Sequence, residues 1–144
     1  MLATGVDLVE VARIARVLER HGERFLQRVF TESEIRYARG NAPELAARFA
    51  AKEAVAKALG VGVRLLSPGG IAWKEAEVCN DGWGRPYVKL HGRAQALAAE
   101  QRLTEWALSL THDGGLAIAF VVALGSSSEG IEEREESCSP SPNA

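Results

Sequence analysis

Residues 48–60 read RFAAKEAVAKALG, a stretch that carries two lines of charge on a helix whose other residues are mostly small and apolar. Because a helix turns about 100° per residue, Glu53 and Lys57 lie one turn apart on one line. Arg48 and Lys52 form a second line roughly a quarter-turn away. We call these the Glu53/Lys57 ladder and the Arg48/Lys52 ladder.

One carboxylate among three cations suits a site for metal-bound phosphate. Glu53 could bind the metal ion, while Lys and Arg side chains could bind phosphate oxygens. The alternative is an ordinary helix surface, since Glu followed four residues later by Lys is also a favoured exposed ion pair. The choice between them depends on the rest of the chain.

The chain has 144 residues and is 47% hydrophobic, which is enough for one compact domain with a core. Its net charge is −2, but residues 125–144 (GSSSEGIEEREESCSPSPNA) carry −4, so residues 1–124 carry +2. A mildly basic domain suits an acidic partner or anionic ligand better than general nucleic-acid binding. We therefore predict a folded domain over residues 1–124 and a disordered, acidic, Ser/Pro-rich tail over residues 125–144.

Composition also indicates the compartment. The two cysteines, Cys79 and Cys138, do not form a disulfide framework, so a reducing cytoplasm is expected. The N-terminus lacks the basic and apolar regions of a signal peptide, and no run approaches about 18 apolar residues. We expect a soluble cytoplasmic domain without a membrane segment.

The spacing of apolar residues predicts an α+β fold, in which an N-terminal strand and helices pack on a largely antiparallel sheet. TESE at residues 31–34 is a capping-box pattern, with Thr31 the expected N-cap. Pro43 and Gly60 suit the two ends of the long helix. Strands are expected over residues 2–8, 71–78, 87–90, 105–111 and 116–124, and helices over residues 11–25, 31–40, 43–60 and 92–102.

Asp7 stands where the first strand gives way to the first helix, in GVDLVE. A carboxylate at a strand end can coordinate a hard cation such as Mg²⁺, which usually takes one or two protein carboxylates together with phosphates and water. The alternative is that Asp7 only caps the following helix.

Arginines recur on one face of the first helix, at Arg13, Arg16 and Arg20, and Arg24 and Arg28 could continue the stripe. Such a stripe predicts docking of an acidic helical partner through electrostatic steering and bidentate contacts. A plain solvated face is the alternative. Nucleic acid ranks low, because neither a recognition helix nor a set of stacking aromatics accompanies the arginines.

Two predicted turns carry polar or cationic groups. Gly84-Arg85-Pro86 lets the backbone approach a ligand and holds one guanidinium beside it, although a hairpin needs Gly and Pro anyway. Thr111-His112 lies at a hairpin tip, where His112 could bind phosphate or move a proton, or could be a plain exposed histidine. A catalytic triad and a zinc site are excluded, since a nucleophile elbow and zinc-ligand spacing are both missing.

Taken together, five segments resemble, in order over residues 4–124, the holo-acyl-carrier-protein synthases, the small bacterial class of 4′-phosphopantetheinyl transferases. The segments are GVDLVEVARI, RVFTESEIRYA, ARFAAKEAVAKALGVGV, NDGWGRPYVKL and LSLTHDGGLAIAFVVAL. The resemblance implies transfer of the phosphopantetheine arm of coenzyme A to a serine of apo-acyl carrier protein, in fatty acid biosynthesis. Adenosine 3′,5′-bisphosphate would be the other product.

The resemblance also implies roles for residues of this chain. The Mg²⁺ ligands would be Asp7 and Glu53. Phosphate-facing cations would be Arg48, Lys52 and Lys57, and the nucleotide cleft would be lined by Gly84, Arg85, Pro86, Thr111 and His112. Carrier docking would fall to Arg13, Arg16, Arg20 and Arg24, and the family assembles as homotrimers with clefts between subunits.

The chemistry fits these residues, because attack of a serine hydroxyl on a pyrophosphate needs mainly charge neutralisation and positioning. Lys57 would stabilise the leaving phosphate. The base that takes the serine proton stays open among a metal-ordered water, Glu53, His112 and Asp113. The competing hypothesis is a non-enzymatic module that binds an acidic protein or nucleic acid through the arginine stripe.

Overall fold

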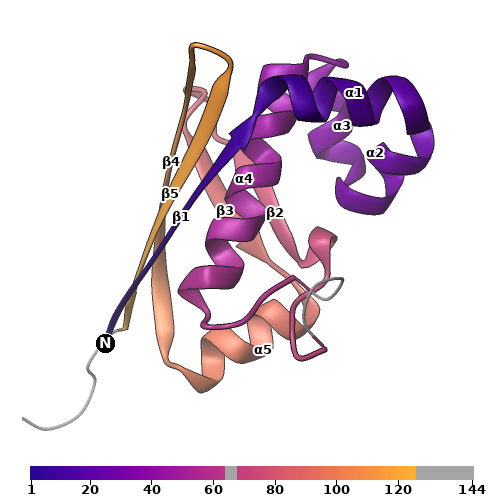
Figure 1. Ribbon diagram of the computed structural model, residues 1–144. Coiled ribbons are helices and arrows are strands. Elements are labelled where there is room, and N and C mark those ends of the chain that lie inside the picture. The colour runs from indigo at the N-terminus through magenta and orange to yellow at the C-terminus, as the bar shows by residue number, and fades with distance from the viewer. Residues whose placement is uncertain (64–67, 126–144) are drawn as a thin grey trace, which may run out of the picture.

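The computed structural model describes residues 1–63 and 68–125 of the chain, and its strands form two antiparallel sheets (Figure 1). The larger sheet has the order β1-β5-β4, made of β1 (Leu2–Glu10), β4 (Leu103–Asp113) and β5 (Leu116–Gly125). The smaller sheet pairs β2 (Ala76–Asn80) with β3 (Pro86–Leu90), and β3 lies beside β4. The predicted α+β class is confirmed.

Five α-helices and one 3₁₀ turn are present in the part of the chain that the structure describes. They are α1 (Val11–His21), α2 (Glu23–Val29), α3 (Glu32–Ala38), α4 (Ala42–Ala58), η1 (Trp73–Glu75) and α5 (Gly92–Glu100). The predicted first helical region is divided at Gly22, whose φ of 51° ends α1. None of the described helices is long and apolar enough to span a membrane.

Local sequence signals set several of these boundaries. The predicted capping box is confirmed, since Thr31 Oγ1 accepts from the Glu34 amide at 3.3 Å and Glu34 Oε1 accepts from the Thr31 amide at 2.9 Å. Asn41 caps α4, and Pro43 lies in its first turn.

One predicted strand is wrong in its first half. Residues 73–75 form η1 because the Glu75 carboxylate accepts from the Ala72 amide at 2.9 Å and closes a tight turn, so β2 begins only at Ala76. At the other end of the chain, β5 continues through Gly125. Part of the predicted 61–70 loop and the predicted tail beyond Gly125 lie outside the described residues.

Helix α4 is the centre of the molecule, because it packs on β1 and β5 on one side and on β2 and α3 on the other (Figure 1). The backbones of α4 and β1 are in direct contact at Gly5. A Cβ placed on Gly5 would lie 1.8 Å from the carbonyl oxygen of Ala54. Glycine is therefore required at position 5 if β1 and α4 are to stay this close.

The three-stranded sheet carries apolar side chains on both faces, and those of the outer face come from β1 and β5. Its inner face, toward α4, is buried and includes Val9, Ala117, Ala119, Val121 and Ala123. Its outer face, on the alternate residues of the strands, exposes Leu2, Val6, Leu8, Leu116, Phe120 and Leu124. An apolar outer face of this size is typical of an interaction surface.

Candidate active site

Asp7 and Lys57 meet where β1 passes α4. The Lys57 Nζ donates to Asp7 Oδ1 at 2.9 Å and to the Val6 carbonyl at 2.8 Å. Asp7 does not cap α1, because the N-cap of that helix is Glu10, which makes no side-chain cap bond. Lys57 forms its ion pair with Asp7 and not with Glu53 one turn earlier, so the surface-pair alternative is also wrong.

Glu53 belongs to the same group of charges. Burial raises the pKa of the Glu53 carboxyl, and the nearby negative charge of Asp7 raises it further, while Lys57 and Arg13 oppose the rise. The two predicted carboxylates, 46 positions apart, are thus close enough to repel each other. A cation between them would relieve that repulsion.

The donor set at Asp7 and Glu53 fits a hard cation shared with a ligand. Mg²⁺ commonly takes one or two carboxylates and completes its octahedron with phosphate oxygens and water. Within residues 1–63 and 68–125 there is no group of three or more His, Cys, Asp or Glu side chains that could form an all-protein cage. These two residues therefore fit Mg²⁺ bound together with a phosphate-bearing substrate.

Lys52 lies in a different environment from Lys57. It is fully buried, and its Nζ donates to Glu34 Oε1 at 2.8 Å, the Trp73 carbonyl at 3.1 Å and the Ala76 carbonyl at 2.8 Å. Burial lowers the pKa of Lys52, and the Glu34 carboxylate opposes the fall. All three ammonium donors are used inside the protein. The prediction that Lys52 faces phosphate is therefore wrong.

Arg48 is also interior, with 1% of its side chain exposed. Its guanidinium donates to Glu44 Oε2 at 2.8 Å and to Asn80 Oδ1 at 2.6 Å, and its Cζ lies 4.3 Å from the centre of the Tyr37 ring. The predicted phosphate cluster is thus not one surface. Of its three cations, only Lys57 has a largely exposed side chain, at 52%.

The Gly84-Arg85-Pro86 turn is held in shape by its neighbours. Asp81 Oδ1 accepts from the Trp83 and Arg85 amides at 2.8 and 2.9 Å, and Gly84 takes a φ of 82°. Asn80 Nδ2 donates to the Gly84 carbonyl at 3.1 Å. A hollow beside the turn is lined by Arg85, Pro86, Ser109, Phe120 and Val122, so the turn borders the outer face of the large sheet.

Thr111 and His112 occupy the exposed end of β4. The register pairs His112 with Ala117 on the inner face, whereas Thr111 pairs with Ile118 on the outer face. The Gly114–Gly115 turn, with φ of 57° and 79°, closes the hairpin. His112 is therefore on the same face of the sheet as Asp7, and its role as a ligand or base stays a prediction.

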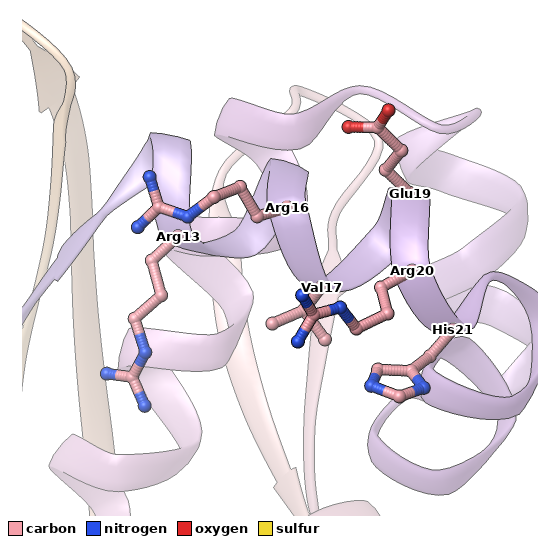
Figure 2. A pocket seen from close by; sticks show the side chains of 6 residues that line it. All are labelled: Arg13, Arg16, Val17, Glu19, Arg20 and His21. Atoms are coloured by element: carbon pink, nitrogen blue, oxygen red, sulfur yellow. The ribbon is translucent and has the colours of Figure 1, made fainter.

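The predicted basic stripe lies on α1. A surface hollow there is lined by Arg13, Arg16, Val17, Glu19, Arg20 and His21 (Figure 2). Arg24 lies past the break at Gly22 on α2, outside this hollow. Arg13 also influences Glu53, so the basic surface adjoins the carboxylate pair.

Three residues that matter to this arrangement were missed as site residues from sequence. The sequence predicts Glu34 only as part of a capping box, although it also pairs with Lys52. The sequence predicts Asn80 only as part of a turn, and it gives no local signal at Gly5. The partners that give each of them its role are distant in sequence, and no local pattern reports them.

The sequence matches the family model described as "4′-phosphopantetheinyl transferase superfamily" over residues 3–121, and the chain belongs to that superfamily. A holo-[acyl-carrier-protein] synthase of Herpetosiphon aurantiacus is 51% identical over 127 residues, which cover 87% of this chain and 100% of the relative. One from Geotalea daltonii is 45% identical over 122 residues, covering 83% of this chain and 94% of the relative.

Solved structures agree. Helicobacter pylori holo-[acyl-carrier-protein] synthase in complex with coenzyme A has a TM-score of 0.74 at 29% identity, covering 84% of this chain and 99% of that one. The enzyme of Neisseria meningitidis has a TM-score of 0.74 at 30% identity, covering 85% and 97%. Within the superfamily, the chain is thus similar to the holo-acyl-carrier-protein synthases, as the resemblance implied.

Proposed function

We propose that this protein is a Mg²⁺-dependent holo-acyl-carrier-protein synthase that transfers the 4′-phosphopantetheine group of coenzyme A to a serine of apo-acyl carrier protein. The observation that carries the proposal is the ion pair of Asp7 on β1 with Lys57 on α4, one turn beyond Glu53, whose pKa is raised in part by the charge of Asp7. The similarity to synthases in both sequence and structure supports it. Its expected setting is fatty acid biosynthesis in the cytoplasm.

In the reaction the serine oxygen forms a bond to the β-phosphorus of coenzyme A, and the bond from that phosphorus to the bridging pyrophosphate oxygen breaks. Adenosine 3′,5′-bisphosphate leaves with that oxygen, and the serine proton passes to a base for which Glu53, His112 and Asp113 are candidates. Mg²⁺ held by Asp7 and Glu53 would supply charge neutralisation at the pyrophosphate.

Lys57 suits stabilisation of the leaving group. Its side chain is about half exposed, and its ammonium already lies 2.9 Å from Asp7, beside the carboxylates that would hold the metal. A positive charge fixed there would offset the negative charge that grows on the departing phosphate. Arg13 adds a second cation near Glu53.

The outer face of the large sheet supports a homotrimer with clefts between subunits. It exposes six large apolar side chains, and the hollow beside the Gly84-Arg85-Pro86 turn opens at its border. A second copy packed on this face would bury the apolar side chains and enclose the hollow. We expect the nucleotide of coenzyme A to lie there, with Thr111 on the same face.

The α1 hollow is the expected docking surface for the acidic carrier. Arg13, Arg16 and Arg20 line the hollow together with Val17, so charge steering and a small apolar contact are available together (Figure 2). Replacing Arg13 and Arg20 by Glu should weaken carrier binding in a salt-dependent way. Equal affinity for wild-type and variant at low salt would exclude this surface.

The test of the whole proposal is direct. The protein is incubated with coenzyme A, Mg²⁺ and apo-acyl carrier protein, and the carrier is weighed by mass spectrometry. The expected result is the mass gain of one phosphopantetheine group, lost when EDTA removes the metal. An unchanged carrier mass would leave the binding-module hypothesis, which the basic surface of α1 alone would support.

A further inference from the structure

The Arg48/Lys52 ladder is buried yet charged, and the reaction proposed above uses neither residue. Lys52 and Glu34 are both fully buried and form an ion pair at 2.8 Å. Buried charges are expensive to desolvate, and such a pair is a weak reason for stability by itself. The Lys52–Glu34 pair lies beside the face of α4 that carries Glu53 and Lys57, and a role in positioning that face would explain why it is there.

We propose that Lys52 is a positioning residue, which fixes the rotation of α4 so that Glu53 and Lys57 are directed at Asp7. This inference rests on the proposed function. It assigns Lys52 to the framework of the site and removes it from the set of coenzyme ligands.

The contacts of Lys52 reach three directions at once. Its ammonium donates to the carbonyls of Trp73 and Ala76, at either end of the η1–β2 junction, and to the Glu34 carboxylate on α3. Three short bonds from one nitrogen define a single position, because moving the ammonium toward any acceptor lengthens the other two. The side chain therefore anchors α4 at one point in the interior.

Glu34 completes the anchor. Its Oε1 also accepts from the Thr31 amide at 2.9 Å, and its Oε2 accepts from the Val78 amide at 3.1 Å. One carboxylate thus joins the start of α3, the middle of α4 and strand β2. Removing either member leaves buried donors or acceptors without partners.

An anchored Lys52 determines the direction of Glu53 because a helix is stiff and consecutive residues differ by about 100° in direction. A small rotation of α4 would carry Glu53 and Lys57 away from β1 together. Gly5 makes the tolerance small, since the β1 and α4 backbones are already in contact there.

Arg48, the other residue of the Arg48/Lys52 ladder, is linked through Asn80 to the Gly84-Arg85-Pro86 turn. Arg48 donates to Asn80 Oδ1 at 2.6 Å, and Asn80 Nδ2 donates to the Gly84 carbonyl at 3.1 Å. The ladder therefore links the helix that carries Glu53 to the turn that carries Arg85. The Arg48/Lys52 ladder therefore positions both parts of the proposed site, namely the catalytic face of α4 and the Gly84-Arg85-Pro86 turn.

The first test compares Lys52→Met with Lys57→Met and with Lys74→Met, an exposed-lysine control. We expect Lys52→Met to lower kcat by about a hundredfold, the effect of a misplacement near 1 Å, with little change in the KM for coenzyme A. The factor should be the same for 3′-dephospho-coenzyme A, which lacks the ribose phosphate. Lys74→Met should behave as wild type.

Two outcomes would overturn the inference. A raised KM for coenzyme A that disappears with the dephospho substrate would make Lys52 a phosphate ligand. Wild-type kcat and KM in a folded Lys52→Met protein would make its role purely structural. If Lys52→Met does not fold, Glu34→Asp replaces it, since that change keeps the charge and shortens the anchor; it should lower kcat at unchanged KM, and wild-type kcat would again overturn the inference.

A second measurement uses the wild-type protein and does not depend on activity. The lysines are Lys52, Lys57, Lys74 and Lys89, and reductive methylation followed by mass spectrometry reports which of them are accessible. We expect Lys52 to be unreactive with and without coenzyme A, while Lys57 reacts and is protected by coenzyme A. Reaction at Lys52 that coenzyme A suppresses would refute its assignment to the framework, whereas failure of protection at Lys57 would count against the proposed function instead.

Discussion

On α4, Lys52 and Lys57 are the same residue type five positions apart, and their surroundings are opposite. Lys52 is fully buried with three protein acceptors, whereas the side chain of Lys57 is 52% exposed and contacts the carboxylate of Asp7. The same holds for their ladders, since Arg48 is interior and Glu53 lies with Asp7. One helix thus carries two lines of charge. Arg48 and Lys52 form a framework line, and Glu53 and Lys57 form a chemical line.

The comparison teaches that charge on a central helix has two separate uses. The buried line binds the helix to α3 through the Lys52–Glu34 ion pair and to β2 through the Arg48–Asn80 hydrogen bond. The partly exposed line keeps free capacity for a metal ion and a phosphate. Environment, and not residue type, decides which line can meet a substrate.

The largest effect should come from the chemical line. Asp7→Ala or Glu53→Ala should lower the rate of carrier modification by about a thousandfold or more, because either change removes half of the metal-binding pair. Carrier mass against time measures the rate, and carrier affinity should stay close to wild type. Transfer at the wild-type rate in both variants would show that the carboxylates do not hold the metal.

Stability should separate the two lysines. Lys52→Met should lower the free energy of unfolding by about 3–5 kcal/mol, because it leaves the Glu34 carboxylate buried without its counter-ion. Lys57→Met should change it by less than about 1 kcal/mol, as expected for a lysine whose side chain is half exposed to solvent. Urea denaturation measures both, and equal losses would contradict the division into two lines.

The contact between β1 and α4 can be broken without touching a charge. Gly5→Ala would place a methyl group 1.8 Å from the Ala54 carbonyl oxygen, so the strand must move off the helix. We expect a loss of about 3 kcal/mol in stability and a weaker response of the melting temperature to Mg²⁺. A variant with wild-type stability would mean that β1 and α4 are less tightly apposed than described.

Acid should lower the free energy of unfolding through the carboxyl of Glu77, which lies on β2. Burial alone would raise the pKa of Glu77 on β2, but bonds from Thr31, His91 and Ser33 lower it to about 2 from 4.5. A depressed carboxyl stabilises the fold above pH 4.5, and this contribution, about 3 kcal/mol, is lost as pH falls toward 2. Glu77→Gln should show a smaller loss between those pH values in urea titrations, and an identical acid profile would refute the assignment.

Much of the site was predictable because its residues carry strong local signals. Asp7 stands out because the first strand is predicted to end near it, although β1 continues to Glu10, and Glu53 and Lys57 follow from helical spacing. The roles of Arg48 and Lys52 were predicted wrongly, since helical spacing places them on a line but does not say whether that line faces solvent. The start of β2 was missed because η1 depends on the Glu75 side chain, which competes with extended pairing.

By itself, the sequence determined the order of helices and strands, the α+β class and the presence of two charged ladders, because periodicity, caps and turns are local properties of the chain. Only the tertiary structure decided which ladder is enclosed and which meets Asp7. The reason is that burial depends on contacts such as Lys52 with Glu34 and Gly5 with Ala54, which join segments far apart in the chain.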